Sequence, residues 1–205
     1  MHYTTLCAAL ATVLLAGLAS AAPPAAAPAA PAATAAGVHY ALDPARSTLQ
    51  FTFLQAGAQN TGRFPRFAVA LDFPGADPAG GRLEVTVEVA ALDTGDKDRD
   101  DTLKSEELFA VKKYPQAHFS AAQIVKTAAG YEAAGQLTIR GVTRDARVPF
   151  TFREATEGGA TIGYMTGRTL VRRLDYGVGQ GEWQATDQAG NDVTVSFNLR
   201  LRRAP

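Results

Sequence analysis

Cysteine and histidine, which carry much of the redox, metal and nucleophilic chemistry of proteins, are scarce in this sequence. Its 205 residues include one cysteine, Cys7, and three histidines. Cys7 lies in an apolar segment near the N-terminus, so the rest of the chain can form no disulfide and has no thiolate for a metal or a substrate. A domain of this size can fold without disulfides because its core is large enough. Thiol chemistry and thiolate metal sites are therefore excluded.

An excess of positive charge is lacking as well. Lysine and arginine together number 20, and so do aspartate and glutamate. Without surplus cations to displace counterions from phosphates, nucleic acid is not expected as a partner. The sequence contains no G-x-S-x-G elbow and no H-E-x-x-H pair, and His39 and His118 stand alone. We therefore predict no catalytic residue, no metal site, no cofactor and no enzymatic activity.

One acidic cluster needs its own explanation. Five aspartates fall within residues 93–101: Asp93, Asp96, Asp98, Asp100 and Asp101. An EF-hand calcium loop has a central glycine and a closing glutamate, whereas Gly95 precedes most of these acids. Lys97 and Arg99 lie among them. We therefore expect salt bridges here rather than a calcium site.

The N-terminal segment contains an uncharged apolar run, Leu6 to Ala19, that is too short for a comfortable membrane span. Such a run, followed by small residues at Ala19-Ser20-Ala21, is typical of a cleaved secretory signal peptide. An uncleaved anchor is the alternative. Residues 22–37 are almost wholly alanine and proline, which favours an extended linker. We expect a signal peptide over 1–21, a linker over 22–37 and one folded domain over 38–205.

Within this domain, apolar and polar residues alternate along many short segments. Leu49, Phe51 and Phe53, for example, share one face of a segment whose other face carries Gln50 and Thr52. The other strand segments are 67–73, 82–90, 117–125, 131–139, 147–152, 161–170 and 193–201. A period of two, with turn residues between segments, predicts about eight strands in an antiparallel sandwich or barrel. A short run at 39–43 is expected either to add a strand or to pair at an edge.

One segment breaks this alternation. Residues 96–109 are rich in helix formers and carry only three apolar side chains, Leu103, Leu108 and Phe109. We predict one short helix there, or a helix with a turn at either end. Its charged face is either simply solvated or forms the outside of a lid, with the three apolar residues turned toward the mouth of a barrel.

Several motifs resemble the YceI family of bacterial periplasmic proteins. They are YALDPARSTLQFTF, GRFPRF, VAALDTGDKDRDDTLKSEELFAVKKYPQAHFSA and GQLTIRGVTRDARVPF, and they extend from Tyr40 to about Leu201. The resemblance implies an all-β fold, an extended antiparallel eight-stranded lipocalin-like β-barrel with a short helix near one mouth. It implies a periplasmic location and a bound isoprenoid lipid, either a polyprenyl chain or an isoprenoid quinone.

The segment from Arg173 to Trp183 is similar to family members associated with cytochrome b561-type membrane proteins, which implies such a partner and favours a quinone. The chain departs from the family pattern at Leu108-Phe109, where two aromatic residues are common. This departure affects the lid or the pocket rather than the fold.

The apolar faces of the expected strands, together with the residues that would close the mouth, are the candidate ligand-binding positions. They are Phe51, Phe53, Phe67, Val69, Val85, Val87, Leu103, Leu108, Phe109, Phe119, Leu137, Ile139, Phe150, Phe152, Trp183 and Phe197. For each of them ordinary core packing is the alternative. Arg99, Arg140 and Arg173 either meet a polar head group or form structural ion pairs.

Two functional hypotheses follow. The first is a periplasmic carrier that holds the lipid inside the barrel, because apolar burial alone can bind a long chain. The second is an envelope interaction module with a solid core, which docks a cytochrome b561-type protein and has no sizeable cavity. The sequence does not decide between a monomer and a homodimer, nor does it identify the lipid.

Overall fold

The computed structural model describes residues 37–204. The expected signal peptide and the expected linker up to residue 36 lie outside the described residues. Ten strands make up most of the domain: β1 (Val38–Leu42), β2 (Thr48–Gln55), β3 (Ala58–Arg63), β4 (Phe67–Phe73), β5 (Arg82–Glu88), β6 (Gln116–Thr127), β7 (Gly130–Ile139), β8 (Val142–Glu157), β9 (Ala160–Arg172) and β10 (Asp192–Arg203). The helices are α1 (Lys97–Lys104) and four short 3-10 turns, η1 (Pro44–Arg46), η2 (Val89–Ala91), η3 (Arg173–Tyr176) and η4 (Gly181–Gln184).

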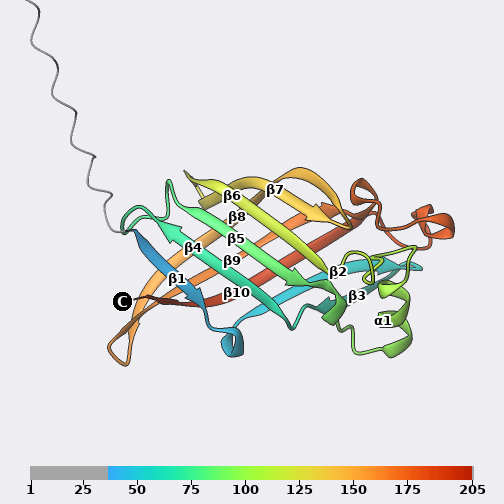
Figure 1. The fold of residues 1–205 in the computed structure, drawn as a ribbon, viewed down its shortest axis with the longest axis horizontal. Coiled ribbons are helices and arrows are strands. Elements are labelled where there is room, and N and C mark those ends of the chain that lie inside the picture. Colours follow the sequence, from blue (N-terminus) through green and yellow to red (C-terminus); the bar gives the residue numbers. More distant parts are fainter. Residues whose placement is uncertain (1–36, 205) are drawn as a thin grey trace, which may run out of the picture. The chain divides into compact units, whose positions relative to one another are not determined.

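Eight of the strands close into an antiparallel barrel, as predicted. Their order is β1-β4-β5-β6-β7-β8-β9-β10, and β1 pairs with both β4 and β10. The long strand β10 pairs with β1 over Leu201–Arg203 and with β2 over Thr194–Asn198. The β2–β3 hairpin therefore continues the barrel wall beyond β1, toward the end that carries α1 (Figure 1).

Two strands extend the set read from the alternation. The run at 39–43 adds a strand, as one of its two alternatives predicted, and it does not lie at an edge, because β1 closes the barrel. Strand β3 was not predicted, since its sequence AQNTGR is polar and shows no alternation. It forms because a tight turn at Ala56-Gly57, where both residues have positive φ, returns the chain along β2.

A β-bulge bends β6 against β7. Ser120 pairs with Gln136 and Gln123 pairs with Ala134, so two residues of β6 oppose Gly135 alone. A Cβ atom at Gly135 would lie 2.0 Å from the carbonyl oxygen of Ser120. Only glycine permits this close approach, and the bulge increases the local twist that barrel closure needs.

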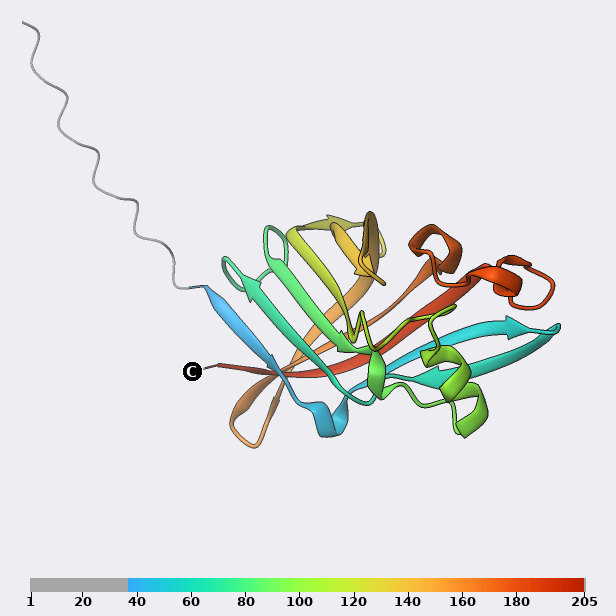
Figure 2. The ribbon, with the colours of Figure 1, turned by 45° about the vertical axis from the view of Figure 1, so that its right-hand side comes forward.

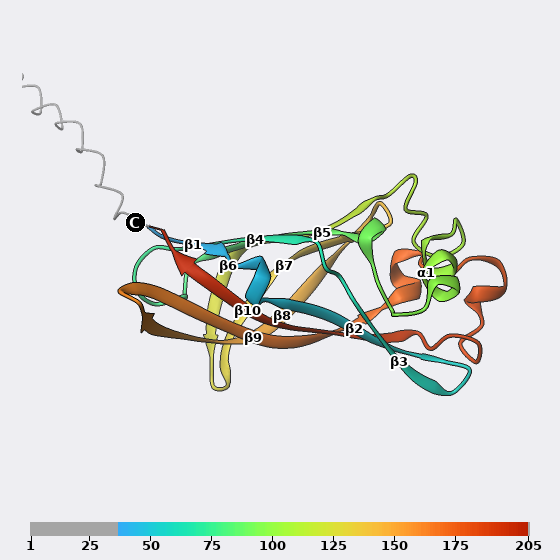
Figure 3. The same ribbon diagram turned by 90° about the horizontal axis from the view of Figure 1, so that it is seen from below.

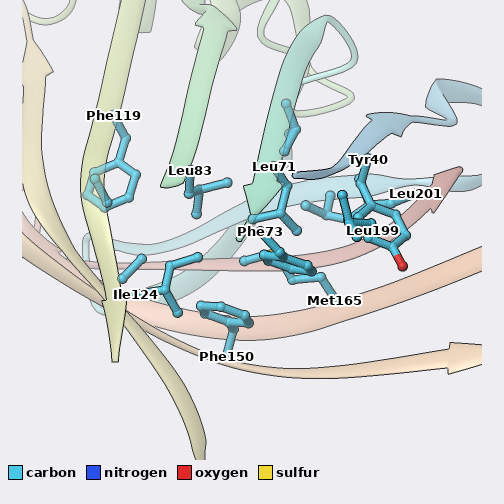
Figure 4. Close-up of a cluster of buried hydrophobic side chains, with 14 residues drawn as sticks. Tyr40, Leu71, Phe73, Leu83, Phe119, Ile124, Phe150, Met165, Leu199 and Leu201 are labelled. Carbon is cyan, nitrogen blue, oxygen red and sulfur yellow. The ribbon is translucent and has the colours of Figure 1, made fainter. Parts of the chain in front are cut away.

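One end of the barrel is filled with side chains. Tyr40, Leu71, Phe73, Phe152 and Leu201 meet there from different strands, and we call this cluster the packed end. Phe152 contacts Tyr40 and Phe73 edge-on, with ring centroids 5.4 and 5.1 Å apart. Figure 4 shows Tyr40, Leu71, Phe73 and Leu201 converging on the interior. Burial of each such side chain contributes about 1.5–3 kcal/mol.

Helix α1 lies at the opposite end, beside the β2–β3 hairpin (Figures 1 and 2). Asp96 caps it by accepting a hydrogen bond from the Arg99 N–H, with a distance of 3.0 Å. The helix ends at Lys104, and turns follow at 106–109 and 111–113, so the segment 96–109 is a helix with a turn after it rather than a single helix. Within residues 37–204, no helix combines the length and the apolar character needed to cross a membrane.

Candidate functional site

A cavity of about 970 Å³ occupies the part of the barrel toward α1. Ligand pockets in proteins commonly measure about 300–1,000 Å³, so this one is large. Its wall contains residues from both sides of the barrel and from the segments that follow α1 and β9. The residues of the packed end do not line it. The interior thus changes along the barrel axis from filled to hollow.

Most of the candidate ligand-binding residues line this cavity. They are Phe51, Phe67, Val69, Val85, Val87, Phe109, Phe119, Leu137, Ile139 and Phe197. They come together because the inward faces of β2, β4, β5, β6, β7 and β10 converge in a closed barrel. The alternation therefore brings the apolar candidates to one continuous surface.

Two candidates from β8 lie in the filled part of the barrel. Phe150 is 3% exposed and stacks on Tyr131, with ring centroids 5.6 Å apart. Phe152 belongs to the packed end, against Tyr40 and Phe73. Both face inward as expected, but other side chains already occupy the space beside them.

Four further candidates pack around the cavity without lining it. Phe53 stacks on Phe51, and Leu103 packs between two apolar clusters near α1. Leu108 and Trp183 pack in the cluster that contains Tyr176 and Val178. Of the three residues proposed for a lid, Leu103, Leu108 and Phe109, only Phe109 lines the cavity.

Several apolar lining residues were absent from the candidate set: Leu49, Phe64, Leu83, Val89, Ala117, Val148, Met165, Val171, Val178, Val193, Val195 and Leu199. Leu49, Val193, Val195 and Leu199 carried a signal, because they share the alternating faces of Phe51 and Phe197. Leu83 and Val89 carried the same signal, because they share the alternating face of Val85 and Val87. Val178 carried none, since it lies in an irregular segment after β9.

The charged lining residues gather on one side of the cavity. They are Arg144, Asp145, Arg147, Arg172, Arg173 and Asp175. All of them belong to the first half of β8, to the end of β9 or to η3. The other polar lining residues are uncharged hydroxyl residues, Thr143, Thr169 and Tyr176, together with Gln136 and His118. The cavity is therefore amphipathic, with its arginines and aspartates on a single wall.

Arg173 is a buried cation in this wall, with an exposed fraction of 7%. Its guanidinium donates hydrogen bonds to the carbonyl oxygens of Gly190, Val178 and Ala189 at 2.9, 2.9 and 2.6 Å. Burial lowers the pKa of Arg173 because water no longer solvates the charge. Beside it Tyr176 also lines the cavity, and burial, followed by the nearby Asp175, raises the pKa of its hydroxyl.

The other two candidate head-group arginines have structural contacts. Arg140 donates from Nη2 to the carbonyl oxygen of Glu106 at 2.8 Å, which fastens the β7–β8 turn to the segment after α1. Arg99 lies 3.6 Å from Asp96 within α1 and its cap. Neither residue lines the cavity. The expected ion pair is present for Arg99, whereas Arg140 contacts a backbone carbonyl oxygen and not an acid.

Ionisable groups outside the cavity pair with one another. Arg63 contacts Asp93 at 2.6 Å, and this arginine, with the Gly95 N–H, lowers the pKa of Asp93. Lys97 pairs with Asp101. These pairs confirm the salt-bridge interpretation of the acidic cluster. Among residues 37–204, no three His, Cys, Asp or Glu side chains are placed to hold a metal ion.

Both histidines of the domain are exposed and lie beside a carboxylate. His39 Nδ1 is 2.5 Å from Asp72, and His118 Nε2 is 3.4 Å from Glu84. The His118 side chain is half exposed, which agrees with the outward orientation expected from the alternation of β6. The two pairs join different strands, and Glu84 also accepts a hydrogen bond from the Ser120 hydroxyl at 2.6 Å.

Comparison with solved structures identifies proteins that have a similar fold. The crystal structure of BcnA from Burkholderia cenocepacia is similar, with 32% identity and a TM-score of 0.70 over 78% of this chain and 98% of that one. A YCEI protein from Campylobacter jejuni is 21% identical, with a TM-score of 0.63 over 70% of this chain and 85% of that one. A polyisoprenoid binding domain from Saccharophagus degradans is 17% identical, with a TM-score of 0.59 over 80% of this chain and 98% of that one. At these lower identities the likeness shows the fold alone.

Sequence comparison gives the family. A UPF0312 protein from Photorhabdus laumondii is 36% identical over 83 residues, which are 40% of this chain and 43% of the relative. A UPF0312 protein from Serratia proteamaculans has the same identity over the same length. The chain thus spans less than half the length of these curated relatives. The model of the YceI-like domain matches residues 40–201, which include all the strands that wall the cavity. The chain therefore belongs to the YceI-like domain family.

Proposed function

We propose that this protein is an exported, periplasmic binding protein that carries a long isoprenoid lipid inside its barrel and does not transform it. The observation that carries this proposal is the apolar cavity of about 970 Å³ at one end of a closed barrel. The lipid is a polyprenyl chain or an isoprenoid quinone. Its chain lies along the apolar wall and its polar end meets the charged wall.

Apolar area alone can supply the affinity. Each buried methylene gains about 0.8 kcal/mol, whereas association costs about 4–15 kcal/mol. A chain of several isoprene units therefore exceeds this cost without directional contacts to its middle. This explains why most of the wall consists of Val, Leu and Phe side chains.

Two further observations support the proposal. The Saccharophagus degradans domain with this fold is described as polyisoprenoid binding. Most of the cavity wall consists of Val, Leu and Phe side chains, which suit an apolar chain. Binding accounts for the cavity without a chemical step.

The interaction-module hypothesis required a solid interior, and the structure instead has a large cavity. The solid interior that this hypothesis requires is therefore wrong for the half of the barrel near α1. A cytochrome b561-type partner remains a proposal, and it fits a carrier at least as well, because a quinone carrier would deliver its cargo to a membrane protein.

Native mass spectrometry of protein purified from cells tests the proposal. We expect wild-type protein to retain a lipid, and we expect Val85→Trp to lose it, because Val85 lines the cavity and a tryptophan would fill the space. Val125→Trp is the matched control, since Val125 is 38% exposed and outside the cavity wall. Bare wild-type protein that also fails to take up added polyprenol would contradict the proposal.

A further inference from the structure

One wall of the barrel carries a surplus of arginine. Strands β8, β9 and β10 are neighbours in the sheet, and together they contain eight arginines and four carboxylates. Strands β5, β6 and β7, on the other side of the closed barrel, contain one arginine and one lysine against three glutamates. Because the whole chain has no net charge, the positive charge is concentrated on the first wall.

Arg168 of β9 lies on the outer face of this wall. It pairs with Ser196 of β10, next to Phe197, which lines the cavity from the inside. Successive side chains of a strand point to opposite faces, so Arg168 points outward, and it is exposed. Arg172, four residues on, pairs with Asp175 at 3.1 Å, whereas Arg168 has no carboxylate within ion-pair distance among residues 37–204. Its charge is therefore available to an external partner.

Arg153 of β8 is a second exposed cation on this face. Its guanidinium lies over the ring of Tyr164 on β9, 4.1 Å from the centroid, and within the described part of the chain it has no ion pair. Thr166 lies between Tyr164 and Arg168 along β9, and its hydroxyl hydrogen-bonds that of Thr151 at 2.8 Å. These neutral groups connect the two arginines, and β9 contains no acidic residue that would offset them.

Two exposed leucines lie on the same outer face. Leu170 of β9 is 58% exposed and follows Arg168 by two residues, and Leu54 of β2 is 49% exposed. Strand β10 lies between them, and its residue Thr194 pairs with Leu170 on one side and with Thr52 on the other. Neighbouring strands are about 4.8 Å apart, so β9 and β2 are separated by about 10 Å. Figure 3 shows β9, β10 and β2 side by side in this wall.

The cavity reaches this outer face beside Leu170. The β8–β9 ladder ends at Phe150↔Gly167, so β8 does not pair with residues 168–172 of β9. Thr169, Leu170 and Val171 all line the cavity, although they point alternately inward and outward. The cavity therefore opens between β8 and β9, next to an exposed leucine and an exposed arginine.

We propose that this outer face docks on a bilayer that contains anionic phospholipids. Leu54 and Leu170 lie against the acyl chains, and Arg153 and Arg168 contact the lipid phosphates. We call these four residues the docking face. The inference goes beyond the proposed function, because it concerns the outside of the barrel and holds for any cargo.

Charge and apolar area both favour this partner. Proteins that lie on a membrane surface combine buried apolar side chains with cations that are attracted to anionic lipids. Each arginine near such a surface strengthens binding about fivefold. The long arginine side chain also reaches the phosphates while its methylene groups stay near the acyl chains. Docking in this orientation places the opening of the cavity against the bilayer.

Vesicle sedimentation tests the inference. Protein purified from cells is mixed at low salt with vesicles of phosphatidylglycerol and phosphatidylcholine, or of phosphatidylcholine alone. We expect binding to the anionic vesicles that is at least about fivefold stronger than to the neutral ones and that weakens at about 0.5 M salt. Arg168→Gln should weaken binding to the anionic vesicles about fivefold. Leu54→Ser should weaken it by a similar factor, because it removes apolar area.

Two matched controls lie across the barrel. Arg82→Gln removes one positive charge from an exposed position of β5, and Val125→Ser removes an apolar side chain that is 38% exposed on β6. Both should bind anionic vesicles like the wild type. Unchanged melting temperatures should show that all four variants are folded, since each altered side chain is exposed.

Three outcomes would overturn the inference. Absence of binding to anionic vesicles would leave the docking face to an acidic protein partner. Equal losses in Arg82→Gln and Arg168→Gln would assign the binding to general surface charge. Unchanged binding in all four variants would assign it to another part of the chain.

Native mass spectrometry of the same samples separates this inference from the proposed function. Arg168→Gln and Leu54→Ser should retain the lipid, because neither position lines the cavity. Protein that retains its lipid but does not bind anionic vesicles would overturn the docking inference alone. Protein that binds the vesicles through the docking face but neither retains nor takes up an isoprenoid lipid would overturn the proposed function alone.

Discussion

The two ends of this barrel use the same strands for different purposes. At the packed end, Tyr40, Leu71, Phe73, Phe152 and Leu201 fill the interior, and the first four of these come from three strands. At the other end, which we call the hollow end, β4 presents Phe67 and Val69 to a cavity, and the neighbouring strand β5 presents Val85 and Val87. The packed end holds the barrel together, so the hollow end can remain open for a ligand.

The buried arginines of the two ends also differ, in the groups that they contact. Near the packed end the buried cation Arg200 is fully matched, with Asp43 at 2.5 Å and Glu157 at 2.7 Å. Near the hollow end the buried cation Arg173 contacts only carbonyl oxygens. Matched charges stabilise a fold, whereas a cation without a carboxylate beside a cavity is available to a ligand.

The largest expected effect is at the packed end. Phe73→Ala should lower the free energy of unfolding by about 3–5 kcal/mol, because Phe73 is 1% exposed and its removal leaves an empty space between Tyr40 and Phe152. Chemical denaturation monitored by circular dichroism measures the change. A loss below about 1 kcal/mol would mean that this end is not tightly packed.

A smaller effect is expected from the equivalent change at the hollow end. Phe67→Ala should cost about 1–2 kcal/mol, since Phe67 is half-buried and already borders the cavity, so no new void is created. The same denaturation experiment compares it with Phe73→Ala. Equal losses in the free energy of unfolding for Phe67→Ala and Phe73→Ala would contradict the distinction between a filled end and a hollow end.

A pH dependence should come from the packed end. Hydrogen bonds from Tyr164, and then from Arg200, lower the pKa of Glu157 below its usual value of 4.5. A carboxyl with a lowered pKa stabilises the fold above its unfolded-state pKa, and this contribution is lost as the pH falls through the folded-state pKa. The melting temperature should therefore drop below pH 4.5. Glu157→Gln should have a lower melting temperature at neutral pH and a weaker dependence on acid. An unchanged acid dependence in Glu157→Gln would show that other carboxyls dominate.

The smallest effect on stability is expected between β8 and β9, at the facing edges 142–149 and 168–172, which do not pair with each other and which we call the seam. Leu170→Ser should change the free energy of unfolding by less than about 0.5 kcal/mol, because Leu170 is 58% exposed. It should nevertheless weaken lipid binding, since Leu170 lines the cavity where it crosses the wall. Thermal unfolding and lipid titration of the same sample separate the two effects. A large loss of stability with unchanged binding would assign Leu170 to the fold.

The sequence predicted the barrel but not its division into two ends. Alternation identifies inward positions along β4 and β8, and the positions were correct. It cannot show that Phe73 and Phe152 meet other rings while Phe67 and Val69 meet empty space, because this depends on how strands distant in sequence approach one another. The polar strand β3 lacked any periodic signal, since the turn at Ala56-Gly57 rather than its own pattern makes it pair.

The seam did have a local signal. Pro149 lies within a segment that alternates like a strand, and a proline there indicates an edge or a break in the ladder. The signal could not show that the break would coincide with the cavity. The clustering of Arg144, Arg147 and Arg172 on one wall depends on the facing of β8 and β9, which lie on either side of the Gly158-Gly159 turn.

Hydrogen–deuterium exchange of the protein with and without geranylgeranyl phosphate tests the central comparison most directly. The account predicts that lipid slows exchange at the seam, over residues 142–149 and 168–172, where backbone groups have no partner across the gap. It predicts no change in the strands of the packed end around Tyr40 and Leu71. Protection that appears at the packed end, or that is spread evenly over the barrel, would contradict the division into a filled end and a hollow, lipid-binding end.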